Sequence, residues 1–141
     1  LKIANRISDA ILITIHFESN ADPLKEGIET LVLSAARVDP GDGEVRKGNA
    51  KDSANIALEE SVHGLCVLKT GRPDGGIRRK NLSVLADVSH PAILLVGGYL
   101  SHPEEARLID TAAYQQSLAE GIALAVVKFR IATTQNMPNS R

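Results

Sequence analysis

The chain has 141 residues, 43% of them hydrophobic, which is enough for one domain with a sizeable core. Its formal net charge is −1, with acidic and basic residues dispersed, so composition gives no support for a nucleic-acid or anionic-membrane ligand. The single cysteine, Cys66, excludes an internal disulfide and a multi-cysteine zinc site, and no apolar run is long enough to span a membrane.

The first half of the chain predicts two strands followed by one helix. Residues 11–16 alternate β-branched isoleucines with other residues, which is typical of a largely buried strand that ends near His16. Residues 28–34 predict a second strand, and residues 35–48 predict a long polar loop, a kind of segment that is often functional. Apolar residues then recur at helical spacing from about residue 49 to 69, and Gly71 is placed to end this helix.

The predicted helix carries a histidine and the cysteine. His63 lies one residue away from the apolar stripe, so we expect it to be a partly exposed helix residue. Cys66 lies on the stripe, so we expect an inert buried thiol rather than a nucleophile.

The second half predicts two further strands and a long helix. A turn at residues 71–76 leads to the basic triplet at 78–80, which we interpret as the solvated entrance of a short strand around residues 82–85. Residues 91–98 predict a buried strand that ends in a glycine pair. Ser101 and Glu104 have the spacing of a capping box, which gives His102 and Glu104 structural roles at a helix start. A final helix is predicted from about residue 110 to 130, followed by a polar tail.

This alternation of strands and helices predicts an α/β fold, with helices on both faces of the sheet. The chain begins at Leu1 rather than at a methionine, in a segment that resembles the end of a helix. We therefore expect that sequence before Leu1 is missing.

His16 is the most informative residue of the chain. An imidazole at the carboxyl end of a strand is well placed to bind a metal, because binding crevices form where strand ends converge. The alternative is a core or edge histidine with a structural role. Glu18 is either a second polar group of such a site, two residues along the same strand face, or an exposed acid that opens the next loop.

One histidine cannot form the site of a zinc hydrolase, which needs about three protein ligands and an open position for water. The common catalytic motifs are absent: there is no His-Glu-x-x-His helix, Walker loop, Gly-x-Gly-x-x-Gly turn or Gly-x-Ser-x-Gly elbow. Motifs of this kind therefore do not decide the function.

Five segments of the chain match one known family in order and in spacing. They are residues 4–6 (ANR), 13–16 (ITIH), 76–85 (GIRRKNLSVL), 91–105 (PAILLVGGYLSHPEE) and 110–120 (DTAAYQQSLAE). Together they resemble the catalytic domain of the zinc-dependent N-acetylmuramoyl-L-alanine amidases, which cut peptidoglycan.

The resemblance implies a zinc-exopeptidase-like fold for residues 1–131, with a mixed, mostly parallel sheet between helices, and a flexible tail at 132–141. It implies hydrolysis, by zinc-activated water, of the amide between N-acetylmuramic acid and the L-alanine of the stem peptide. The partner is then peptidoglycan, without nucleic acid or a membrane span, and the location is periplasmic or extracellular. The resemblance leaves the oligomeric state open.

The same resemblance makes His16 one of three zinc ligands. The other two, a histidine and a glutamate, would lie before Leu1, and the sheet would lack its N-terminal strand or strands. Val96 stands where the family has its catalytic glutamate, and Glu18 stands where the family often has asparagine. An isopropyl group cannot take a proton from water or return one to the leaving nitrogen, so we expect this chain as written to be inactive.

Two other hypotheses remain open from the sequence. The first is a degenerate family member that binds peptidoglycan or a partner without hydrolysis. The second is an unrelated α/β domain with a core histidine.

Overall fold

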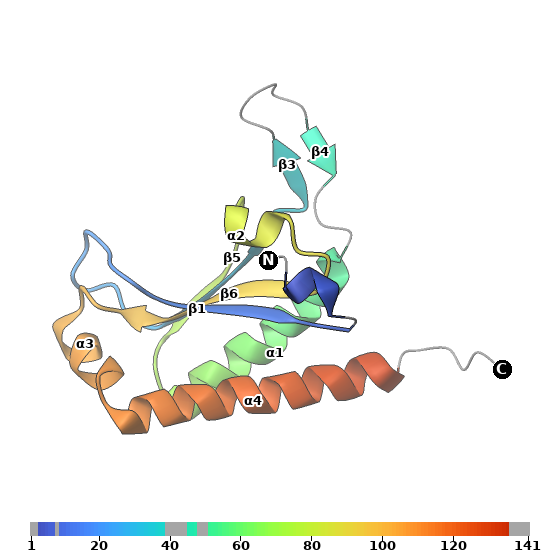
Figure 1. Cartoon of the computed structure of the whole chain (residues 1–141). Helices are drawn as coiled ribbons and strands as arrows, with labels where there is room; N and C mark the ends of the chain where they lie inside the picture. Colours follow the sequence, from blue (N-terminus) through green and yellow to red (C-terminus); the bar gives the residue numbers. More distant parts are fainter. Residues whose placement is uncertain (1–2, 8, 39–44, 48–50, 136–141) are drawn as a thin grey trace.

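A four-stranded sheet organises the structure, a computed structural model that describes residues 3–7, 9–38, 45–47 and 51–135 (Figure 1). Its strands are β1 (Leu12–Glu18), β2 (Ile28–Leu33), β5 (Asp74–Lys80) and β6 (Ala92–Tyr99), in the order β1-β6-β2-β5. β1 is parallel to β6 and β2 is parallel to β5, whereas β2 and β6 are antiparallel. The predicted mixed, mostly parallel sheet is therefore confirmed.

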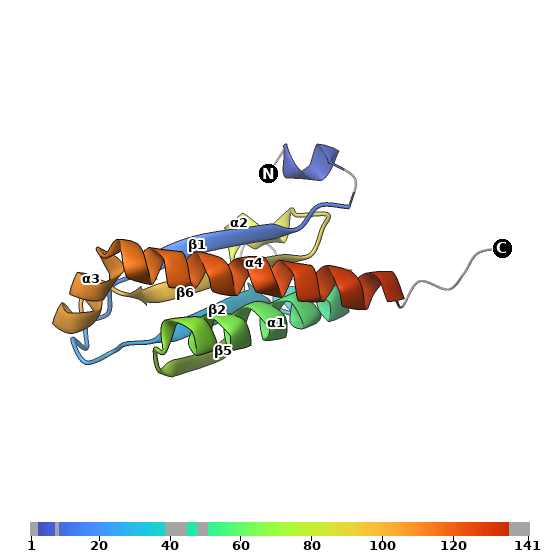
Figure 2. The ribbon, with the colours of Figure 1, turned by 90° about the horizontal axis from the view of Figure 1, so that it is seen from below.

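Helices cover the two faces of this sheet unequally. The long helices α1 (Asp52–Thr70) and α4 (Ala112–Gln135) lie side by side on one face, which we call the helical face (Figure 2). The short helix α2 (Ser83–Ala86) packs on the opposite face, which we call the α2 face, and α3 (Pro103–Ile109) lies beyond the end of β6 (Figure 1). Within the described ranges, none of these helices is long and apolar enough to cross a membrane.

The hydrophobic core is divided by the sheet into two clusters. Alternate residues of β6 point to opposite faces, so Ile93 and Leu95 join the cluster beneath α1 and α4, while Leu94 and Val96 join the cluster beneath α2. All eight residues of β6 are buried, because this strand is central and covered on both faces. Close packing of α1 on α4 requires Gly121, where an added Cβ would lie 3.0 Å from the Cys66 Cα and the Leu65 carbonyl oxygen.

The ends of α1 follow the predicted signals. Gly71 ends the helix in the left-handed conformation, with φ of 65°, and its N–H donates to the Val67 carbonyl. Cys66 is fully buried, and burial raises the pKa of its thiol to about 12, which confirms the expected inert cysteine.

Several predicted elements differ from the observed ones. The segment predicted as a loop contains two short antiparallel strands, β3 (Ala36–Val38) and β4 (Val45–Lys47), while residues 39–44 and 48–50 lie outside the described residues. The strand predicted around residues 82–85 is wrong, because this segment forms α2 and the basic triplet lies inside β5. β5 is hard to recognise because it is a polar edge strand that contains two glycines.

The predicted capping box and tail also need correction. The N-cap of α3 is His102, whose Nδ1 accepts from the Glu105 N–H, while the Ser101 hydroxyl oxygen accepts from the Asn20 N–H instead. His102 therefore has the expected structural role at the start of α3, but it caps the helix itself, in place of the predicted pair of Ser101 and Glu104. α4 extends through Gln135, so residues 132–135 of the predicted tail are helical, and residues 136–141 lie outside the described residues.

The expectation of a partly exposed His63 is wrong, because this side chain is buried between α1 and the sheet. Its Nδ1 lies 3.0 Å from the Thr30 hydroxyl on β2, and its Nε2 lies 2.8 Å from the Asp74 carboxylate at the start of β5. The bond to His63 lowers the pKa of Asp74, together with the bond from the Gly76 N–H. His63 therefore ties one helix to two strands and has a structural role.

Glu59 gives a testable prediction about stability. This carboxyl group is 4% exposed, and its Oε2 has no hydrogen-bond partner. Burial raises its pKa from 4.5 to about 7, with nearby Arg79 opposing the shift. Because the unfolded chain loses this proton first, stability should fall as the pH rises from about 4.5 to 7, by about 3 kcal/mol when the shift is complete.

We therefore expect Glu59→Gln to be more stable than the wild type at pH 8 and to lose this advantage at pH 4. Urea unfolding at both values measures the effect, with Glu60→Gln, at an exposed position on the same helix, as the control. An equal advantage of Glu59→Gln at both pH values would contradict the assignment.

Candidate functional site

His16 lies near the carboxyl end of β1, as predicted, and its side chain is exposed. Its register partner on β6 is Val96, and the register partner of Val96 on β2 is Glu29. Register partners on neighbouring strands project from the same face, so these three residues form a row across the sheet on the α2 face. His16 makes no side-chain bond to another residue within the described ranges.

The end of β6 departs from regular strand geometry directly after Val96. The β1 to β6 register shifts between His16 and Glu18, so Glu18 pairs with Tyr99. Gly98 has φ of 135°, which favours glycine, and an added Cβ at Gly97 would come within 2.9 Å of Leu118 and Phe17. The predicted glycine pair therefore allows this irregularity where β6 ends.

A buried carboxylate, Glu105, holds this end of β6 in place. The carboxylate accepts the Tyr99 N–H at 2.7 Å and the Gly27 N–H at 3.0 Å, and the Arg72 Nε lies 2.9 Å from it. Arg72 also pairs with Glu26. A fully buried charge needs partners of this kind. The sequence interpretation assigned no role to Glu105, because two of its partners, Gly27 and Arg72, lie far from it in the sequence.

A second polar cluster lies beside the row of His16, Val96 and Glu29. Glu29 is 4% exposed and accepts from the Tyr99 hydroxyl at 2.6 Å. It also pairs with the Arg78 Nε at 3.1 Å and with the Lys25 Nζ at 3.5 Å. Burial raises the pKa of the Tyr99 hydroxyl, and the bond to Glu29 adds to the shift. Tyr99 is therefore a neutral hydrogen-bond donor over the physiological pH range.

Glu18 contributes mainly through its backbone. Its carbonyl accepts the Leu100 N–H at 2.7 Å, which joins the last residue of β1 to the segment after β6. Its side chain makes no bond to His16. Its negative charge contributes to the raised pKa of Tyr99, so the carboxylate lies near the second polar cluster.

The donor set around His16 does not by itself fit a zinc ion. A zinc site with an open position needs about three protein ligands, and His16 supplies one imidazole. The described residues contain no group of three or more His, Cys, Asp or Glu side chains that could hold a metal. Val96, the neighbour of His16 in the row, is apolar and 2% exposed.

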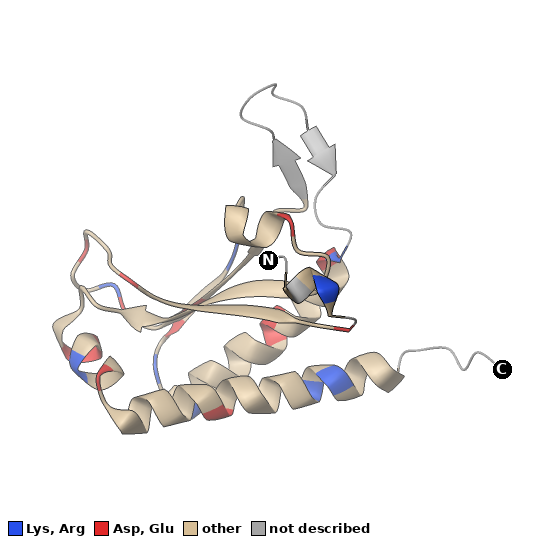
Figure 3. Cartoon of the chain, in the orientation of Figure 1, with Lys and Arg blue, Asp and Glu red and all other residues tan. Residues whose placement is uncertain are grey.

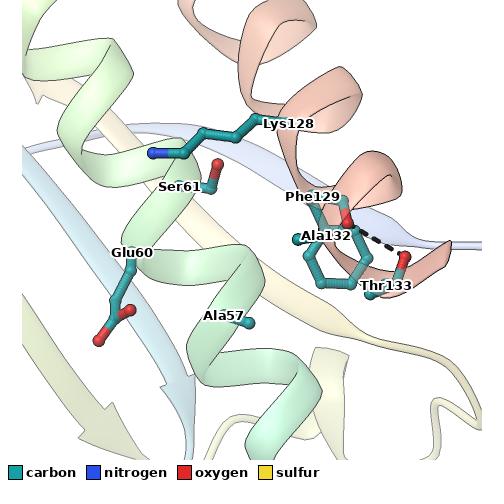
Figure 4. Close-up of a pocket in the computed structure, with 7 residues that line it drawn as sticks. All are labelled: Ala57, Glu60, Ser61, Lys128, Phe129, Ala132 and Thr133. Atoms are coloured by element: carbon teal, nitrogen blue, oxygen red, sulfur yellow. Dashed lines mark hydrogen bonds between the residues drawn. The ribbon is translucent and has the colours of Figure 1, made fainter. Parts of the chain in front are cut away.

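Two cavities of the described structure lie away from this row. One cavity of about 230 Å3 lies between α1 and α4, and its polar lining residues are Glu60, Ser61, Lys128 and Thr133 (Figure 4). Another, of about 440 Å3, is lined in part by Ile11 and Pro91, near the opposite ends of β1 and β6 from His16. Acidic and basic residues are spread over many of the elements rather than gathered on one of them (Figure 3). The row on the α2 face thus remains the candidate site.

Comparisons with known proteins show the family to which the chain belongs. A family model described as N-acetylmuramoyl-L-alanine amidase matches residues 1–128. The chain is similar to the catalytic domain of CwlV, an N-acetylmuramoyl-L-alanine amidase from Bacillus (Paenibacillus) polymyxa var. colistinus, with a TM-score of 0.75 and 26% identity; the match covers 92% of this chain and 63% of that one.

Two further relatives extend the comparison. An N-acetylmuramoyl-L-alanine amidase from Clostridium difficile 630 has a TM-score of 0.76 and 29% identity, over 92% of this chain and 62% of that one. YrvJ of Bacillus subtilis (strain 168) is 32% identical over 72 residues, which are 51% of this chain and 14% of YrvJ. The chain thus spans less than two thirds of the length of each of these proteins.

The family match covers nearly the whole chain, and the fold agrees with two of its solved structures, so the hypothesis of an unrelated α/β domain is wrong. The chain belongs to the N-acetylmuramoyl-L-alanine amidase family.

Proposed function

We propose that this chain is part of a cell-wall hydrolase that cleaves the amide between N-acetylmuramic acid and L-alanine of peptidoglycan. The observation that carries the proposal is the family match over residues 1–128, together with the fold shared with two amidases that are more than 25% identical to it. In this reaction water adds to the carbonyl carbon, the C–N bond breaks, and a proton reaches the departing nitrogen. Its site of action is then the cell envelope, in the periplasm or outside the cell.

We also propose that His16 is one ligand of a zinc ion. An exposed imidazole that makes no bond to any described residue, at the carboxyl end of a parallel strand, supports this role. Because the described residues bring no further ligands to His16, the others would have to come from polypeptide outside them. Glu18 would then act at most on the surroundings of the metal, since it makes no bond to the His16 ring.

A zinc titration of the chain followed by NMR of the histidine rings tests the role of His16. The ring signals of His16 should shift before those of the other histidines, and His16→Ala should remove the effect. His90→Gln is the matched control, because His90 lies before the start of β6, at the opposite end of the strand from Val96. Zinc-dependent shifts that leave His16 unmoved would contradict the assignment.

We further propose that the chain with Val96 hydrolyses peptidoglycan slowly or not at all. No carboxylate occupies the place of Val96 beside His16, and the acid of the row, Glu29, is held by the Tyr99 hydroxyl and by ion pairs with Arg78 and Lys25. Loss of a general acid or base typically lowers the reaction rate by roughly 10²- to 10⁴-fold. Binding of peptidoglycan without hydrolysis is the alternative, and Val96 is the observation in its favour.

The substitution Val96→Glu tests this point in a polypeptide that contains this chain and binds zinc. Val96→Glu should release stem peptides from sacculi at least about 10²-fold faster than the wild type, because a carboxylate can move the protons. Val96→Gln controls for size and polarity, since an amide cannot transfer a proton in the same way. Equal rates for the wild type and Val96→Glu would show that Val96 does not limit the reaction.

A further inference from the structure

Arg78 and Arg79 are neighbours in β5 but lie on opposite faces of the sheet. Arg78 pairs through its Nε with Glu29 on the α2 face, and its side chain is 54% exposed. Arg79 pairs instead with Asp52 at the start of α1, through an Nη1 to Oδ1 distance of 2.7 Å. The basic triplet is therefore not a uniformly solvated edge, since only Arg78 of this pair faces the candidate site.

The guanidinium of Arg78 is anchored at one nitrogen. Glu29 is nearly fully buried and is itself fixed by the Tyr99 hydroxyl and the Lys25 ammonium group. Lys25 also lies over the Tyr99 ring, with its Nζ 5.4 Å from the ring centroid. The Nε of Arg78 is used in this cluster, while its two Nη groups make no bond to the described residues.

The charges of this cluster balance when Glu18 is counted with it. Arg78 and Lys25 are cationic, Glu29 is anionic, and Tyr99 is neutral because burial raises its pKa. Glu18 on β1, opposite Tyr99, adds a second negative charge near the cluster. An anchored guanidinium with two free Nη groups is suited to bidentate recognition of a carboxylate.

The cluster lies within reach of a substrate held at His16. Glu29 is two strands away from His16 in the row, and neighbouring strands are about 4.8 Å apart, so their Cα atoms are separated by roughly 10 Å. Two residues of an extended peptide span about 7 Å. Arg78 itself lies one strand beyond β2, opposite Leu31, but its Nε reaches the Glu29 carboxylate. A stem peptide with its scissile amide near His16 can therefore bring the carboxylate of its second residue toward the guanidinium at Glu29.

We propose that Arg78 is a specificity-determining residue that binds the free α-carboxylate of the D-glutamate following L-alanine in the stem peptide. Glu29, Tyr99 and Lys25 are positioning residues that hold its guanidinium. This inference rests on the proposed function, because it takes peptidoglycan as the substrate. It predicts that the protein binds a stem peptide with a carboxylate at this position more tightly than one with an amide there.

The experiment compares two ligands that differ in one group. N-acetylmuramyl-L-alanyl-D-glutamate carries the carboxylate, and the D-isoglutamine compound carries an amide in its place. Titration of the chain with each, followed by NMR of the backbone amides, should give at least tenfold tighter binding of the carboxylate compound. The largest shifts should lie in β5 and β2.

Matched variants identify the residue responsible. Arg78→Met should bind both compounds equally, whereas Arg79→Met removes the same charge from the other face and should keep the preference. Arg78→Lys should keep part of it, and Glu29→Gln should weaken it by loosening the guanidinium. Native-like amide spectra show that each variant is folded. The preference of the wild type for the carboxylate compound is measured without any variant, so it tests the proposal even if a variant does not fold.

Three results would overturn the inference: no preference in the wild type, a preference retained in Arg78→Met, or an equal loss in Arg79→Met. Failure of the proposed function is seen separately. It would appear as the absence of stem-peptide release by a zinc-bound Val96→Glu polypeptide, whatever the binding preference. Hydrolysis without a carboxylate preference would remove Arg78 from recognition and leave the amidase proposal intact.

Discussion

The buried carboxylate of Glu105 is the interaction on which the geometry of the candidate site depends. It joins the N–H of Gly27, just before β2, to the N–H of Tyr99, the last residue of β6, and it pairs with Arg72 between α1 and β5. These bonds offset the cost of burying a charge, so loss of the carboxylate would leave Arg72 and two backbone donors without it, at a cost of about 3–5 kcal/mol. This junction lies beside the pairing of Glu29 with Val96 and of Val96 with His16, so it supports the row that forms the candidate site.

Strong hydrophobic patterns explain which parts of the fold are predictable from sequence. The central strand β6 is a continuous apolar run, its neighbour β2 ends in the apolar residues 31–33, and α1 ends at a glycine in the expected conformation. β5 carries little such signal, because it is an exposed edge with glycines and arginines, and α2 is a single short turn of helix. His63 appears exposed in a helical pattern, but Thr30 and Asp74 provide buried partners that periodicity cannot reveal.

The candidate site also has some features that the sequence predicts and others that only the structure reveals. The position of His16 at a strand end and the replacement at Val96 follow from the pattern and from the resemblance to the amidases. The partners of Arg78 do not, because its contact with Glu29 depends on the register of β5 against β2 and its support by Tyr99 depends on the irregular end of β6. Two adjacent arginines of the same type therefore have different roles, which their sequence positions alone do not distinguish.

The two edge strands of the sheet differ in their tendency to pair with a further strand. β5 presents three consecutive basic residues, and charge of this kind discourages the addition of another strand. β1 is largely apolar, with Ile15 47% and Phe17 37% exposed, and among the described strands it has a neighbour on one side only. Pairing of a further strand with the sheet is therefore favoured at β1, next to His16, and opposed at β5, next to Arg78.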